Sequence, residues 1–169
     1  SFSVLMGFIF MCLYLLFLYG HMLLLLTLAF GDKIYAVSSR GNLAAIELRS
    51  GNILWKRQYS SYREISLNRN SIYLTTDRGH VYSVNRNEGL EQWNNLELNN
   101  RGVTGPAVFG RYIVVGDFDG YLHFIDQDSG EIVARHHVDG SGLHSAPVIA
   151  NDLVIVQSRD GDLEAIKTP

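Results

Sequence analysis

The stretch GNLAAIELRSGNILW, residues 41–55, carries the pattern that decides the fold of this 169-residue chain. Two glycines ten residues apart enclose a mixed apolar and polar run, and a tryptophan follows four residues after the second glycine. The glycine pattern recurs along the chain at Gly79 and Gly89, Gly120 and Gly130, and Gly161. The first glycines of successive units lie 38, 41 and 41 residues apart. A period of about 40 residues is typical of stacked β-sheet repeats.

The third unit can be divided into four strands by its apolar runs and turn residues. These runs are Pro106 to Phe109, Tyr112 to Gly116, Tyr121 to Ile125 and Glu131 to Val138. The second run is continuously apolar, which is typical of a strand buried on both faces. Gly120 ends the sequence DFDG between the second and third runs, and it provides the positive φ that a tight hairpin turn requires. Four strands joined by tight turns predict one propeller blade.

The chain is therefore predicted to be all-β, as a partial β-propeller of four-stranded antiparallel blades. The repeat covers residues 29–169 and amounts to about three and a half blades. A propeller closes with roughly four to eight blades, so eight blades at this period need about 320 residues. We expect this chain to be the C-terminal part of a larger propeller.

Residues 1–28 form an apolar segment that precedes the repeat, and no charged residue occurs before Asp32. The segment is longer than the roughly 18 apolar residues that indicate a membrane span. Three interpretations remain open: a transmembrane or uncleaved signal helix, a truncated or frame-disrupted upstream sequence, and a buried part of the first blade. The repeat spacing favours a first strand beginning at Thr27, so a helix and a blade compete for the end of this segment.

The composition argues against nucleic-acid binding and against a disulfide. The net charge is −3, and no stripe of Lys and Arg indicates nucleic-acid binding. Cys12 is the single cysteine, so no intramolecular disulfide forms. Trp55 and Trp93 recur at one repeat position, which favours packing between blades over a ligand platform.

Two groups of polar residues are candidate metal ligands. The six histidines lack ligand spacing and are predicted to be surface or turn residues: His21, His80, His123, His136, His137 and His144. The acidic pairs are predicted to be hairpin-turn aspartates, because they lack the spacing and the bidentate glutamate of a calcium loop: Asp117 with Asp119, and Asp126 with Asp128. We predict no metal, no cofactor and no catalytic residue.

A family resemblance rests on the same residues. Ala45-x-Glu47-x-x-Ser50-Gly51-x-x-x-Trp55 resembles the tryptophan-docking repeat of quinoprotein propellers, and residues 83–93 and 124–134 are weaker copies. Two families use this repeat. Quinoprotein dehydrogenases bind pyrroloquinoline quinone and calcium, whereas the BamB family of outer-membrane assembly lipoproteins keeps the fold without the cofactor. Residues 31–167, and residues 41–57 above all, are similar to the BamB family.

The resemblance implies a non-enzymatic scaffold on the periplasmic face of the bacterial outer membrane. It implies binding to the periplasmic POTRA domains of BamA, contact with unfolded outer-membrane proteins, and membrane association through an N-terminal anchor. A lipoprotein anchor needs a cysteine after a small residue, but Cys12 follows Met11. Two alternatives remain: a fragment of a quinone-dependent dehydrogenase, and a propeller of other purpose anchored in the inner membrane.

Ile46, Leu48 and Arg49 are the predicted partner-binding residues. Strand alternation puts Ile46 and Leu48 on one face at the end of a third strand, where they form an apolar pair at the rim. Arg49 adds a planar donor for carboxylates, and this mixture is typical of binding hot spots. The alternative is that Ile46 and Leu48 belong to the core and Arg49 is solvated.

Overall fold

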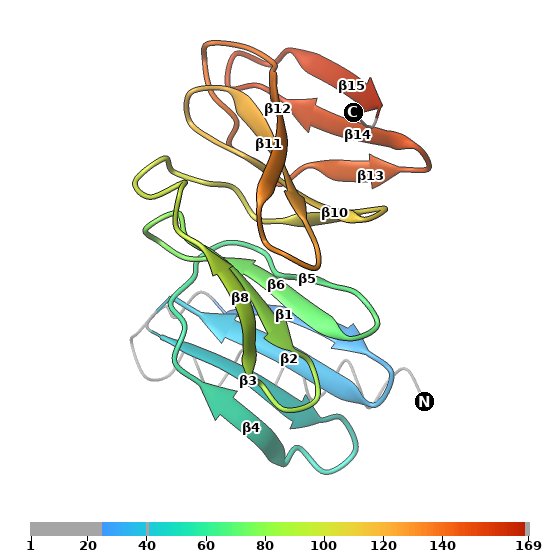
Figure 1. Ribbon diagram of the computed structural model, residues 1–169. Helices are drawn as coiled ribbons and strands as arrows, with labels where there is room; N and C mark the ends of the chain where they lie inside the picture. Colours follow the sequence, from blue (N-terminus) through green and yellow to red (C-terminus); the bar gives the residue numbers. More distant parts are fainter. Residues whose placement is uncertain (1–24, 40, 168–169) are drawn as a thin grey trace.

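The computed structural model describes residues 25–39 and 41–167. Within these ranges the chain folds into fifteen strands and no helix. The strands form three four-stranded sheets and one three-stranded sheet, and in each of them consecutive strands pair antiparallel (Figure 1). We call the sheets blades 1 to 4 in chain order.

The strand bounds follow the repeat. Blade 1 comprises β1 Leu25–Phe30, β2 Lys33–Ser38, β3 Asn42–Glu47 and β4 Ile53–Arg57. Blade 2 comprises β5 Ser66–Leu67, β6 Ser71–Thr75, β7 Val81–Asn85 and β8 Glu91–Asn95. Blade 3 comprises β9 Ala107–Phe109, β10 Tyr112–Gly116, β11 Tyr121–Asp126 and β12 Ile132–His137. Blade 4 comprises β13 Val148–Ala150, β14 Leu153–Gln157 and β15 Leu163–Lys167.

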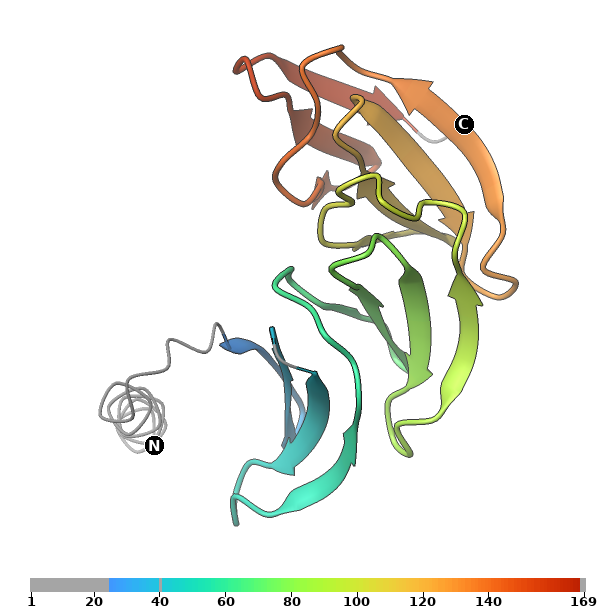
Figure 2. The same ribbon diagram turned by 90° about the vertical axis from the view of Figure 1, so that its left-hand side faces the viewer.

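The four blades follow one another around an arc, face against face (Figure 2). This arrangement confirms the prediction of an all-β partial propeller with about three and a half blades. The expected boundary between the apolar segment, residues 1–28, and the propeller, residues 29–169, falls within β1. Residues 25–30 pair in one continuous register with β2. Residues 1–24 of the apolar segment lie outside the described residues.

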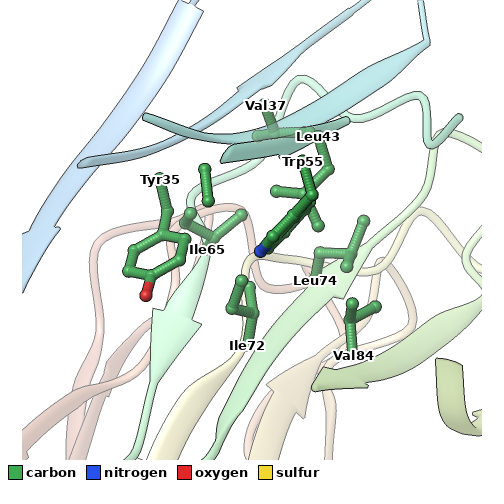
Figure 3. Close-up of a cluster of buried hydrophobic side chains, with 9 residues drawn as sticks. Tyr35, Val37, Leu43, Trp55, Ile65, Ile72, Leu74 and Val84 are labelled. Carbon is green, nitrogen blue, oxygen red and sulfur yellow. The ribbon is translucent and has the colours of Figure 1, made fainter. Parts of the chain in front are cut away.

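Apolar clusters fill the seams between neighbouring blades. In blade 2, Ile72 and Leu74 pack against blade 1, whereas Tyr73 between them packs towards blade 3. Alternation along a strand explains this, since successive side chains point to opposite faces. Figure 3 shows the first seam, where Trp55 of blade 1 lies among side chains of both blades. The continuous apolar runs of the sequence therefore reflect strands that are covered on both faces.

Each tryptophan docks onto the strand 3–4 turn of the following blade. Trp55 Nε1 donates to the carbonyl of Arg86 at 3.1 Å, and Trp93 Nε1 donates to the carbonyl of Gln127 at 2.7 Å. The rings lie so close to Gly89 and Gly130 that a Cβ on either glycine would stand 2.6 Å from an indole carbon. The prediction that both tryptophans pack between blades is confirmed. The second glycine of each pair thus makes room for the preceding blade's tryptophan.

The first glycines close the hairpins between the second and third strands, as the sequence predicts. Gly79, Gly120 and Gly161 have φ angles of +87°, +82° and +98°. In all three turns the glycine N–H donates to the carbonyl three residues earlier. This conformation is strained for residues with a side chain, so the repeat keeps glycine there.

Two tyrosines at one repeat position provide a matched test of buried hydrogen bonding. Tyr35 and Tyr73 are both buried and both lie against the tryptophan of their own blade. The Tyr73 hydroxyl accepts from Asn68 Nδ2 at 2.9 Å and donates to Gln127 Oε1 at 3.1 Å. The Tyr35 hydroxyl has no hydrogen-bond partner among the described residues.

We expect Tyr73→Phe to lower the free energy of unfolding by about 1 kcal/mol, because it removes a hydroxyl with two partners. Tyr35→Phe should be neutral or stabilising, because it removes a buried hydroxyl that has none. Urea unfolding of both variants measures the difference. Equal losses in the two variants would show that the Tyr35 hydroxyl is bonded in solution.

Candidate functional site

The predicted partner-binding residues lie at the end of β3 and in the turn that follows it. Ile46 is half-buried, Leu48 is 36% exposed and Arg49 is exposed. The turn is held by the Leu48 N–H, which donates to the carbonyl of Asp32 at 2.8 Å. The Ser50 hydroxyl also donates to the Glu47 carboxylate. The structure therefore brings the three residues together on one edge of blade 1.

The other blades show what these positions do in the repeat. The residue equivalent to Ile46 is buried against the preceding blade in each case: Val84, Ile125 and Ile166. The residues equivalent to Leu48 are Arg86 and Gln127, whose carbonyls accept the indole N–H bonds. Ile46 and Leu48 thus occupy blade-packing positions, on the face of blade 1 that points away from blade 2. Arg49 occupies an exposed turn position, like Asn87 and Asp128.

Two apolar residues that the sequence analysis did not single out extend this edge. Ile53 is 61% exposed and Leu54 is 47% exposed, and both lie at the start of β4 directly after the turn. A bulge between Ala45 and Ile46 in the β3–β4 pairing precedes the turn. We call residues 46–54 the blade 1 edge. Its apolar side chains and its arginine are the kind of mixture that binds protein partners.

A buried ionic network in blade 3 is the second candidate site. Asp117 is fully buried, and His123 is 1% exposed. His123 Nε2 lies 2.8 Å from Asp117 Oδ2, and Arg101 Nε donates to the same oxygen at 2.6 Å. Arg101 Nη2 also donates to Asp119 Oδ2 at 2.8 Å. The β8–β9 connection and the β10–β11 hairpin are thereby tied together at this end of the blades.

Asp117 remains ionised in this network. Burial opposes its ionisation, but hydrogen bonds from His123, the Tyr121 N–H and Arg101 outweigh burial and lower the pKa of Asp117 to about 2. Because an ionised carboxylate only accepts, His123 Nε2 carries the proton of the shared hydrogen bond. In the neutral imidazole Nδ1 is then an acceptor, and it is buried with no partner among the described residues.

This network corrects the prediction for His123, which is neither a surface nor a turn residue. His123 lies inside β11, where a polar side chain is tolerated because a buried carboxylate accepts its hydrogen bond. Equivalent positions hold Ala44, Tyr82 and Glu164, so the network belongs to blade 3 alone. The sequence contained one signal for it, a histidine within a run otherwise typical of a buried strand.

The aspartates behave as the sequence predicts. Asp117 Oδ1 accepts from the N–H groups of Asp119 and Tyr121, each at 3.0 Å. Asp126 Oδ1 accepts from the N–H groups of Asp128 and Ser129 at 3.0 and 3.1 Å. Both aspartates therefore cap their own hairpin turns. In residues 25–39 and 41–167, no three carboxylate, imidazole or thiol side chains gather as a metal site, and no helix is long enough to span a membrane.

An open hollow of about 440 Å³ lies beside the Asp117 network, between blade 3 and the β8–β9 connection. Six residues line it: Glu97, Arg101, Asp119, Tyr121, His123 and Arg135. Arg135 Nη2 lies 3.9 Å from Glu97 Oε2, so this ion pair is loose.

The fold and its seams define a tryptophan-docked β-propeller of the quinoprotein type. A crystal structure of BamB from Moraxella catarrhalis superposes with a TM-score of 0.79 at 28% identity, over 84% of this chain and 42% of that chain. Quinohemoprotein alcohol dehydrogenase from Comamonas testosteroni superposes with a TM-score of 0.64 at 16% identity, over 79% and 28% of the two chains. The second likeness concerns the fold alone.

Sequence comparisons identify the family. The family model described as outer membrane protein assembly factor BamB matches residues 24–95 and 95–168. The BamB of Shewanella oneidensis is 50% identical over 84% of this chain and 36% of its own length. The BamB of Escherichia coli is 36% identical over 79% of this chain and 34% of its own length. The chain belongs to the BamB family, and it spans about a third of these relatives.

Proposed function

We propose that this chain is part of a non-enzymatic scaffold in the outer-membrane β-barrel assembly machinery. The observation that carries the proposal is the BamB family model, which matches both halves of the described blades. The packing supports it, because the seams between blades are filled by side chains and leave exposed turns and edges for binding. In the proposal the propeller works through protein contacts rather than through a reaction.

The proposed partner is the periplasmic POTRA region of BamA, and the proposed contact is the blade 1 edge with Leu48 and Arg49 at its centre. The exposed aliphatic side chain contributes apolar area, and Arg49 contributes a fork of donors for a carboxylate. Ile46 supports the edge from a half-buried position. We further propose a location on the periplasmic face of the outer membrane, an N-terminal anchor, and contact with unfolded outer-membrane proteins.

The test compares Leu48→Ala and Arg49→Ala in the complete protein. We expect Arg49→Ala to weaken capture of the BamA periplasmic region at least about fivefold with an unchanged melting temperature, because a charged hydrogen bond is lost without a packing contact. Leu48→Ala should weaken capture as well. Pull-down at graded BamA concentrations and thermal unfolding of the same samples provide both readings.

Arg78→Ala is the matched control, because Arg78 is an exposed arginine in the β6–β7 turn at the opposite end of the blades. The control should bind BamA normally. Undiminished capture by both edge variants would reject this site. A collapsed melting temperature in Leu48→Ala would instead assign Leu48 to packing against a preceding blade, as the equivalent positions suggest.

A further inference from the structure

We propose that the hollow between blade 3 and the β8–β9 connection is a recognition site for a guanidinium group, presented by an arginine side chain of a protein partner. The site is separate from the blade 1 edge, and its residues come from the β8–β9 connection, the β10–β11 turn, β11 and β12.

The charges of the site favour a cation. Both donor groups of Arg101 that face this network are occupied by Asp117 and Asp119. Among the described residues, Glu97 has only the distant Arg135 as an ionic partner, and the side chains of Glu97 and Asp119 remain 62% and 45% exposed. Three carboxylates thus stand against two arginines. The excess negative charge attracts a cation to the mouth of the hollow.

The buried imidazole of His123 also favours a ligand that donates a hydrogen bond. His123 lines the hollow and its Nε2 proton is bonded to Asp117, while its Nδ1, an acceptor in the neutral imidazole, has no hydrogen-bond partner in the part of the chain that the structure describes. A buried polar atom without a partner carries a free-energy cost that a donor from a ligand relieves. A guanidinium offers five N–H donors in one plane, enough to serve Nδ1 and the carboxylates together.

The aromatic and apolar surroundings favour a guanidinium on a protein over a free ammonium. Tyr121 lines the hollow and is 38% exposed, and although its ring packs edge-on against His137 at 4.8 Å between centroids, part of it is left for stacking. Guanidinium groups stack on aromatic rings more readily than ammonium groups do. Leu96 and Phe118 are each 51% exposed and directly precede two lining residues in the chain. These exposed apolar side chains provide contacts for the segment of the partner that carries the arginine.

The experiment is an NMR titration of the full chain with Nα-acetyl-arginine amide, observing the histidine imidazoles. We expect the His123 signal to move on saturation, and Glu97→Gln to raise the dissociation constant at least about threefold, the scale of an exposed charged pair. Glu131→Gln is the matched control, because Glu131 is an exposed carboxylate at the other end of blade 3, and it should leave the affinity unchanged. Nα-acetyl-lysine amide should bind more weakly.

Three results would overturn the proposal. The first is a His123 signal that stays fixed at saturating arginine amide, or that never saturates. The second is an unchanged affinity in Glu97→Gln together with an unchanged affinity in Asp119→Asn. The third is an acetate titration that moves the same signals more strongly, which would make the hollow an anion site built on Arg135.

Discussion

Gly120→Ala is expected to lower the free energy of unfolding more than alanine at any other described glycine, by on the order of 4 kcal/mol or more. The φ angle of Gly120 is +82°, and a Cβ there would stand only 1.4 Å from the carbonyl oxygen of Asp139. Backbone cannot move aside as a side chain can. The Val138 N–H also donates to the carbonyl of Gly120 at 2.9 Å, so the hairpin would have to part from the strand beside it.

Gly161→Ala provides the control, because Gly161 has a φ of +98° and no atom within 4 Å of its Cβ position. This variant should lose only the conformational cost of a positive φ, about 1 kcal/mol. Denaturant unfolding of both variants measures the two free energies. Equal losses would mean that backbone conformation alone, and not the approach of Asp139, requires glycine at Gly120.

Asp117→Asn is expected to lower the free energy of unfolding by about 3 kcal/mol. The amide nitrogen that replaces Asp117 Oδ2 is a donor, and it faces two further donors, Arg101 Nε and His123 Nε2. The half-buried Arg101 then keeps only the carboxylate of Asp119 as a counter-charge within the network. Thr76→Ala is the control, since Thr76 caps the equivalent turn of blade 2 without such partners. It should lose about 1 kcal/mol.

The pH dependence of stability gives an independent reading of the same residue. The pKa of Asp117 is about 2 in the folded protein against an ordinary value of 3.8. A lowered pKa means that its stabilising contribution is complete above pH 4 and disappears as the pH falls through 2. The difference in unfolding free energy between the wild type and Asp117→Asn should therefore shrink from pH 4 towards pH 2. A difference that stays constant over this range would show that Asp117 does not titrate between pH 4 and pH 2.

The sequence by itself determined the fold of this protein. Glycine at a period of about 40 residues, apolar runs of strand length and a recurrent tryptophan all depend on local conformation and on neighbouring units. Such features repeat because each blade meets the same physical conditions as the one before it. The strand bounds of blade 3 and the turns at Gly79, Gly120 and Gly161 could therefore be predicted without coordinates.

The candidate site was predictable only in part, because only some of its features depend on local sequence. The exposed turn at Leu48 and Arg49 follows from strand alternation and turn position, which are local. The packing role of Ile46 emerged only when its equivalents Val84 and Ile125 were seen buried against the preceding blade. Partner binding by this edge remains a prediction.

Only the tertiary structure decided where the ionic side chains meet. Arg101 is 16 residues from Asp117 in the chain, and His123 is six residues away on the next strand. These groups converge because the β8–β9 connection passes over the β10–β11 hairpin, a geometry set by the packing of blade on blade. A repeat pattern describes what the blades share, and this network exists where blade 3 differs from the others. Sequence periodicity therefore predicts the framework, whereas contacts between distant segments build the network within it.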